Sequence, residues 1–282
     1  MKNYETIKVE ERDDGISIIT FNRPERLNAM SLQYTEDMLD YLTTLEDNLT
    51  IRVLILTGEG RGFSSGLDLK ESQLFYNKKV PEDYEKHKYL ITKDLVKRSF
   101  YAQKTLSKIM LKLRRIPQPV IAAVNGPAYG GGLGLAIAAD IRIASENAIF
   151  CNAFIKIGVS GADMASSYWL PRLIGFSRAA EFMYTGRDMD AREAEKYGLV
   201  SRVVPDNELM NEVMKTAEMI LKKSPLGVKL TKEALNINID APSLEAAIEL
   251  ENRTQVICIN TKDAPEGAFS LLAKKEPKYD KW

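Results

Sequence analysis

A short glycine-rich stretch, NGPAYGGGLGLA at 125–136, is the feature that most constrains what this chain can fold into. It lies between the apolar runs VIAAV at 120–124 and AIAA at 136–139. Three consecutive glycines, Gly130 to Gly132, open a segment that we expect to be a helix. Glycine leaves backbone N–H groups uncovered, and a helix N-terminus supplies N–H donors without internal partners. The stretch therefore predicts a strand, a bare turn and a helix whose first N–H groups face a ligand.

A second turn of the same kind occurs earlier in the chain. GRGFSSGLDL at 60–69 follows the apolar run VLILTG at 53–58 and precedes another expected helix start. If both strands belong to one sheet, the two turns can aim two N–H groups at one oxygen atom, which is an oxyanion hole. Alternatively, the glycines merely allow a strand and a helix to pack closely. Either stretch alone favours this alternative, but the similarity of the two turns favours the oxyanion hole.

Strand-like and helix-like segments alternate along the chain, which predicts an α/β fold. The predicted strands are at 16–21, 53–58, 119–126, 141–145 and 148–152, and a helix capped by Ser31 follows the first of them. Further helices are predicted at about 167–183, 190–198, 206–223, 225–236 and 241–259. The long polar segment at 69–116 separates the two glycine turns, and we expect it to be either a lid over a pocket or a solvated helical arm.

The composition is that of an ordinary globular protein and excludes several classes. Lys+Arg and Asp+Glu number 39 each, so no overall charge favours nucleic acid or an anionic membrane surface. The two cysteines, Cys151 and Cys258, lie far apart and predict neither a disulfide framework nor a zinc site. The charged N-terminal segment does not resemble a secretory signal, and no apolar run has the length of a membrane helix. These observations predict a cytoplasmic protein without a bound metal.

The chain resembles the crotonase (enoyl-CoA hydratase/isomerase) superfamily over nearly its whole length. The stretches that carry the resemblance are ITFNRPERLNAMS (19–31), FSSGLDL (63–69), PVIAAVNGPAYGGGLGLAIAADIRIAS (119–145), LPRLIGFSRAAEFMYTGR (170–187) and AREAEKYGLVSRVVP (191–205). The resemblance implies a spiral of ββα units with a C-terminal helical region that forms trimers or dimers of trimers. It implies a core at 1–205, with 69–116 as a lid-like insertion, and a helical region at 206–282. Members bind acyl-CoA thioesters, so coenzyme A enters as part of the substrate and no separate cofactor is expected.

The resemblance also implies roles for particular residues. The backbone N–H groups of Leu67 and Gly131 are expected to hold the thioester oxygen as it becomes enolate-like. Around them, the expected substrate-binding residues are Ser65, Gly66, Asp68, Gly130, Gly132, Gly134 and Phe154. Because coenzyme A carries phosphates, cations are expected along it: Arg23, Arg26, Lys274 and Lys275 match the family's basic contacts, the last two often reaching a neighbouring subunit.

The chain departs from the hydratases at two positions where they carry glutamate, which here hold Gly134 and Phe154. One acid remains nearby, Asp163, at a position where isomerases and dehalogenases of the superfamily place an aspartate. We expect Asp163 to act as general acid and base in hydration or isomerisation of an enoyl-CoA. Two alternatives are a nucleophilic Asp163 acting on an aryl- or acyl-CoA, and an N-cap of the helix at 164–170. The dehalogenases also use a histidine and a tryptophan, replaced here by Ser107 and Phe154, which weakens the first alternative.

A non-catalytic homologue that binds acyl-CoA or RNA is the hypothesis of another class. The segment KTLSKIMLKLRR at 104–115 places four cations on one helical face: Lys104, Lys108, Lys112 and Arg115. With no net charge and no interleaved aromatic side chains, this pattern is more typical of an amphipathic surface helix. The single histidine, His87, is expected to be a surface residue, and Cys151 a buried structural thiol.

Overall fold

The computed structural model describes residues 3–72, 92 and 94–279 and has the predicted α/β architecture. A six-stranded sheet, ordered β1-β2-β3-β4-β6-β9, runs through the molecule. Its strands are β1 (Ile7–Glu11), β2 (Ile16–Phe21), β3 (Val53–Gly58), β4 (Val120–Val124), β6 (Ile141–Ser145) and β9 (Arg202–Val204). β1 is antiparallel to β2, and every other neighbouring pair is parallel. The glycine turns after β3 and β4 therefore leave the same edge of the sheet from adjacent strands.

A second, three-stranded sheet produces the spiral. It is ordered β5-β7-β8 and consists of β5 (Ala128–Tyr129), β7 (Ile149–Cys151) and β8 (Asp188–Asp190). The chain passes from β4 to β5 through only 125–127, continues into α4 (Gly131–Ala138), and then repeats the move from β6 to β7. Asn125 holds the first corner, where its Nδ2 donates to the carbonyls of Gly58 and Gly60, both at 2.9 Å. The two strand–strand–helix passages are the expected ββα units.

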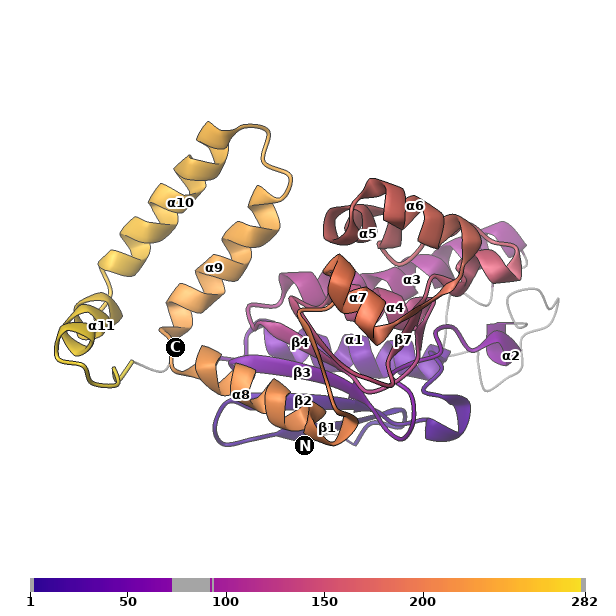
Figure 1. Cartoon of the computed structure of the whole chain (residues 1–282), viewed down its shortest axis with the longest axis horizontal. Coiled ribbons are helices and arrows are strands. Elements are labelled where there is room, and N and C mark those ends of the chain that lie inside the picture. The colour runs from indigo at the N-terminus through magenta and orange to yellow at the C-terminus, as the bar shows by residue number, and fades with distance from the viewer. Residues whose placement is uncertain (1–2, 73–91, 93, 280–282) are drawn as a thin grey trace.

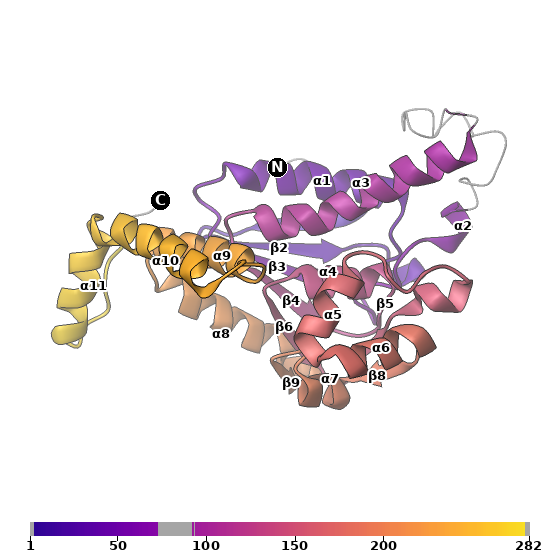
Figure 2. The ribbon, with the colours of Figure 1, turned by 90° about the horizontal axis from the view of Figure 1, so that it is seen from above.

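Helices cover both faces of the large sheet (Figure 2). On one face lie α1 (Leu32–Glu46), α3 (Leu95–Arg115) and α4, which share one core cluster with side chains such as Ile19, Leu54 and Leu56. On the other face α8 (Leu209–Leu221) packs its Val213 and neighbouring apolar residues against the alternate strand residues, and the short helix at 206–208 leads into it. Ser31 caps α1 as predicted, accepting from Tyr34 N at 3.0 Å.

The single helix predicted at 167–183 is wrong. The structure has two helices there, α5 (Ser166–Ile174) and α6 (Phe176–Thr185). The break occurs at Gly175, whose φ of 81° and ψ of 153° lie outside the helical region and are open to glycine. Next come β8 and α7 (Ala191–Tyr197). Of the segment at 69–116, the structure describes α2 (Leu69–Ser72) and α3, so His87 lies outside the described residues.

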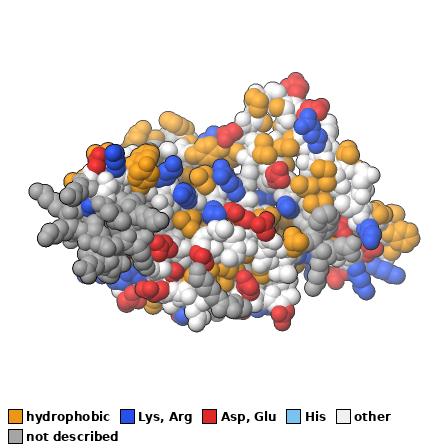
Figure 3. All heavy atoms as spheres, turned by 180° about the vertical axis from the view of Figure 1, so that it is seen from behind, with side chains coloured by type: hydrophobic (Ala, Val, Ile, Leu, Met, Phe, Trp, Pro, Cys, Tyr) orange, Lys and Arg blue, Asp and Glu red, His pale blue; other side chains and the backbone are white. Residues whose placement is uncertain are grey.

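The last three helices stand away from the two sheets (Figure 1). They are α9 (Pro225–Asn238), α10 (Leu244–Ile259) and α11 (Asp263–Leu272). Figure 3 shows hydrophobic side chains gathered over this part of the molecule, where Phe269, Leu271 and Leu272 are each more than three-quarters exposed. In the part of the chain that the structure describes, none of the helices combines the length and the apolar character needed to cross a membrane.

A buried lysine fixes α9 to the core. Lys232 is 6% exposed, and its ammonium donates to the carbonyls of Leu113 at 3.0 Å and Gln118 at 2.7 Å. It also pairs with Asp140 at 3.0 Å, and Asp140 in turn pairs with Arg114 at 3.0 Å. Burial lowers the pKa of Lys232, while the charge of Asp140 opposes this. The buried ammonium of Lys232 therefore holds α9 to the end of α3. Losing either the ammonium or one of its partners would leave a buried charge or polar group unpaired.

Replacing Lys232 with methionine tests this attachment. Lys232→Met removes the cation and leaves two buried carbonyls without their donor, so the free energy of unfolding is expected to fall by about 3 kcal/mol. Urea denaturation followed by circular dichroism measures the change. Lys229→Met, an exposed position one turn earlier on α9, is the control and should change stability little. Equal stability of the two variants would contradict the assignment.

Candidate active site

The two glycine turns lie against each other at backbone-contact distance. Tyr129 N donates to Ser64 O at 2.9 Å, and Ser64 N donates to Pro127 O at 3.0 Å. A Cβ atom on Gly66 would lie 2.9 Å from Gly131 N, and one on Gly132 would lie 2.1 Å from Ser64 O. The glycines are thus required for close packing, as the alternative interpretation held, and the same packing brings the two turns together as the oxyanion-hole hypothesis requires.

Two backbone N–H groups at this junction have no protein acceptor. Met30 pairs with the first turn through its own N–H to Gly66 O and through Asp68 N–H to Met30 O, which leaves the N–H of Leu67 unused. Gly131 is the first residue of α4, so its N–H has no partner within the helix. Among the described residues, neither N–H donates a hydrogen bond to the protein. Both residues line the same cavity, and the Cβ position of Gly131 is 3.8 Å from Leu67 N.

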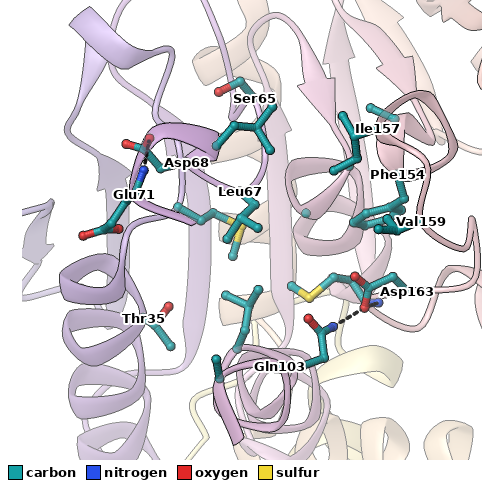
Figure 4. Close-up of a pocket in the computed structure, with 18 of the residues that line it drawn as sticks. Thr35, Ser65, Leu67, Asp68, Glu71, Gln103, Phe154, Ile157, Val159 and Asp163 are labelled. Atoms are coloured by element: carbon teal, nitrogen blue, oxygen red, sulfur yellow. Dashed lines mark hydrogen bonds between the residues drawn. The ribbon is translucent and has the colours of Figure 1, made fainter. Parts of the chain in front are cut away.

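The cavity in front of these N–H groups has a volume of about 460 Å³ and mostly apolar walls (Figure 4). Its residues come from the start of α1, from α2 and α3, from the two turns, and from the segment between β7 and α5. The apolar lining side chains are Met30, Leu32, Leu67, Leu69, Ala102, Leu106, Ala153, Phe154, Ile157, Val159, Ala162 and Met164. A cavity of this kind suits an acyl chain.

Asp163 reaches the cavity from a tightly bonded loop. Ser166 N donates to Asp163 O at 2.8 Å, and Asp163 N donates to Ser166 Oγ at 3.2 Å. The Ser166 hydroxyl and the amide of Asn152 both donate to Gly161 O, each at 2.9 Å. Met164 and Ala165 have φ angles of 49° and 63°, a left-handed conformation that costs free energy for residues with a Cβ. The bonds on either side hold this strained backbone in place.

The carboxyl group of Asp163 is half-buried and bonded on one oxygen. Oδ1 accepts from Met164 N at 2.7 Å and from Nε2 of Gln103, a residue of α3 that the sequence did not single out (Figure 4). Burial raises the pKa of Asp163, and the two hydrogen bonds oppose this effect. The N-cap interpretation of Asp163 is wrong, because α5 begins at Ser166 after Ala165 and has no side-chain cap.

At the two positions without glutamate, Phe154 and the Met164 side chain in front of Gly134 form part of the apolar wall. Phe154, in the short helix at 153–157, is 8% exposed and lines the cavity. At Gly134, a Cβ atom would lie 2.7 Å from the Cβ of Met164, which is 2% exposed and also lines the cavity. Met164 therefore occupies the room that a side chain at 134 would need.

Asp68 binds both predicted phosphate-contacting arginines. Its carboxylate is 4% exposed and lies 3.0 Å from Nη2 of Arg23 and 2.9 Å from Nη2 of Arg26, which belongs to the short helix at 24–26. Burial acts to raise the pKa of Asp68, but hydrogen bonds from Arg23, from the backbone N–H of Glu71 and from Arg26 outweigh it and lower the pKa. Because Asp68 lines the cavity, it holds two guanidinium groups beside that cavity. Two arginines against one carboxylate leave a net positive charge there.

Of the remaining predicted residues, some line the cavity and others lie away from it. Ser65 and Gly130 line the cavity, but Lys274 and Lys275 follow α11 at the opposite end of the molecule (Figure 1). Cys151 is fully buried, its Sγ contacts Gly186 O at 3.1 Å, and burial raises the pKa of its thiol to about 11. The segment at 104–115 packs its apolar residues into the core, which is the amphipathic surface helix that the spacing favours.

Comparisons with known proteins agree with this geometry. The family model described as enoyl-CoA hydratase/isomerase matches residues 11–281. A probable enoyl-CoA hydratase of Mycobacterium tuberculosis is 43% identical over 276 residues, which cover 97% of this chain and 92% of the relative. The 1,2-epoxyphenylacetyl-CoA isomerase of Escherichia coli is 32% identical over 267 residues, which cover 95% of this chain and 95% of that enzyme. A crystal structure of enoyl-CoA hydratase from Bacillus anthracis superposes with a TM-score of 0.86 at 34% identity, over 99% of this chain and all of that one.

The match begins at the last residue of β1 and continues beyond the C-terminal helices, so it includes both glycine turns, the Asp163 loop and the spiral of ββα units. With its acyl-CoA-processing relatives and crotonase fold, this chain belongs to the enoyl-CoA hydratase/isomerase family of enzymes.

Proposed function

We propose that this enzyme moves a proton along the acyl chain of an enoyl-CoA, with Asp163 as the single acid and base, and so shifts a carbon–carbon double bond. The observation that carries the proposal is the half-buried carboxyl of Asp163, which lines the same cavity as the unpartnered N–H groups of Leu67 and Gly131. A thioester oxygen bound at these two N–H groups places the neighbouring carbons of the acyl chain inside this cavity.

The chemistry is a proton transfer in two steps. The carboxylate of Asp163 removes a proton from the chain, and the electron pair of the broken C–H bond moves into an enolate whose charge rests on the thioester oxygen. The N–H groups of Leu67 and Gly131 stabilise that oxygen, because they point at charge that develops only in the reaction. The protonated carboxyl then returns its proton to another carbon, so no water is consumed. One group that takes and returns a proton works best with a pKa nearer neutrality, which burial favours at Asp163.

The shape of the cavity favours isomerisation over hydration. Adding water requires groups that hold and activate it, but at the two positions where the hydratases carry glutamate the cavity wall is formed by Met164, in front of Gly134, and by Phe154. The other two carboxylates that line the cavity are already engaged: Asp68 binds two arginines, and Glu71 accepts from Leu32 N at 2.8 Å. Among the relatives, the Escherichia coli enzyme is named an isomerase and the Mycobacterium tuberculosis protein a probable hydratase, so both reactions have precedent.

The phosphates of coenzyme A are proposed to contact Arg23 and Arg26, which Asp68 holds beside the cavity. Lys274 and Lys275 follow α11 and are not among the residues that line the cavity. We propose that they serve the cavity of a neighbouring subunit, in a trimer or a dimer of trimers that covers the exposed apolar side chains of α11.

The first test replaces Asp163 with asparagine. Asp163→Asn keeps the shape of the side chain and leaves the N–H donors intact, so binding of an acyl-CoA should persist. Turnover of a β,γ-enoyl-CoA to its α,β-isomer should fall by roughly 10²- to 10⁴-fold, the usual share of general acid–base catalysis. Because the protonated carboxyl can exchange its proton with solvent between the two steps, the thioester recovered from heavy water should carry some deuterium with the wild type and much less with the variant, as mass spectrometry measures.

The exposed Asp13→Asn serves as the control and should behave as wild type. Wild-type turnover by Asp163→Asn would refute the proposed role. A product heavier by one water would establish hydration instead of isomerisation, and an adduct on the peptide that contains Asp163 would establish a nucleophile.

The second test removes one N–H donor of the oxyanion hole. Gly131 is the first residue of α4, where proline is tolerated, so Gly131→Pro deletes the donor with little cost to the helix. Gly131→Ala is the matched control, because its Cβ meets the same flexible Met30 side chain, at 2.7 Å, while the N–H remains. The proline variant should lose a further ~10²- to 10³-fold in kcat relative to the alanine variant. Equal kcat values in two folded variants would count against the oxyanion hole.

The third test concerns assembly. Light scattering of the purified chain is expected to give the mass of a trimer or of a dimer of trimers. Introducing charge at exposed apolar positions of α11, in the double variant Leu271→Glu and Leu272→Glu, should produce smaller species, because burying two unpaired carboxylates is costly. Leu49→Glu, an exposed leucine in the loop between α1 and β3, is the control. A wild-type monomer at micromolar concentration would contradict the proposed assembly.

A further inference from the structure

Gln103 is the one side chain outside the Asp163 loop whose hydrogen bond to that carboxyl is described. It lies on α3 between Ala102 and Leu106, which are buried and line the same cavity. The backbone of α3 is fixed by the apolar side chains Ile109, Met110 and Leu113 in the main core. A side chain on so firmly packed a helix can hold the carboxyl in one orientation, and Figure 4 shows Gln103 and Asp163 pointing toward each other.

Both donors to Asp163 bind the same oxygen. Met164 N and Gln103 Nε2 donate to Oδ1, and no donor to Oδ2 is found among the described residues. A carboxylate oxygen that accepts two hydrogen bonds holds negative charge in place and binds a proton less readily than its neighbour. The two oxygens of Asp163 are therefore chemically unequal, and Oδ2 is the stronger base.

Resting on the proposed function, we propose that Gln103 is a positioning residue: it fixes the rotation of the Asp163 carboxyl so that Oδ2 is the atom that exchanges protons with the acyl chain. The C–H bond of the substrate breaks toward Oδ2, and the same O–H later delivers the proton to the second carbon. Without Gln103, Met164 N–H alone holds Oδ1, and the carboxyl can turn away from the reacting carbons.

The charged groups near Asp163 do not obscure the effect of Gln103 on the pKa of Asp163. The elements packed about the loop carry Lys104 and Lys108 on α3, both exposed, Lys156, which pairs with Asp188 at 3.1 Å, and Arg172, which pairs with Asp240 at 2.9 Å. Asp68 and Glu71 lie on the opposite wall of the cavity (Figure 4). The causes that shift the pKa of Asp163 are burial, the Met164 N–H and Gln103, in that order, and none of these charged groups is among them.

The test is a series of variants at position 103 with a defined order. Gln103→Leu removes the donor at nearly constant size, which raises the pKa of Asp163 and moves the acid limb of kcat/KM to higher pH. Gln103→Glu has the same shape, but its negative charge should move the limb further. Above the limb, kcat of the leucine variant should fall roughly 10- to 100-fold because the carboxyl is misplaced, while KM changes little. Lys104→Leu, the next residue of α3, is the control.

The outcomes separate this inference from the proposed function. Combined with Asp163→Asn, Gln103→Leu should cause no further loss, since both act through one group. An equal loss with and without Asp163, or an acid limb that stays in place in both variants, would overturn the positioning role. If Asp163→Asn is itself fully active, the proposed function fails. The contact between Gln103 and Asp163 can then still be tested by titrating the ¹³C-labelled carboxyl of Asp163 directly. A higher titration midpoint in Gln103→Leu supports the contact, and an unchanged midpoint refutes it.

Discussion

The approach of two backbone turns to contact distance is the constraint on which the rest of this structure depends. Ser64 and Tyr129 hydrogen-bond across the junction, and the approach is possible only because Gly66 and Gly132 lack side chains. The parallel pairing of β3 with β4 brings the two turns to the same edge of the sheet. Close packing and the free N–H groups result from the same arrangement. A substitution that pushes the two turns apart would therefore also move the N–H donors.

The acid in the cavity depends on a different kind of support. Asp163 precedes two residues with left-handed backbone, and the hydroxyl of Ser166 and the amide of Asn152 hold that loop from both sides. Met164, the first of the strained residues, also fills the wall beside Gly134. This loop therefore places a carboxyl and an apolar side chain next to each other in the cavity wall.

Much of the fold and part of the site could be predicted from the sequence, for reasons that lie in local pattern. The glycine turns, the buried strands and the Ser31 cap each have a signature within about ten residues. Gln103 has none, because its contact with Asp163 joins residues 60 apart and arises only when α3 packs. The burial of Lys232 is hidden in the same way, since its partners come from three other segments. The break at Gly175 shows the opposite failure, in which an apolar helical spacing conceals a glycine that ends a helix.

The α3 helix contacts two distant parts of the molecule at two points along its length. Its final turn is bonded to α9 through the carbonyl of Leu113 and the ammonium of Lys232, and Gln103 lies ten residues earlier, about 15 Å along the axis. A helix of that length transmits a small tilt at one end as a lateral shift at the other. The C-terminal helices and the Asp163 carboxyl are thus connected through one helix, so a tilt of α3 at its contact with Lys232 would displace Gln103 relative to Asp163.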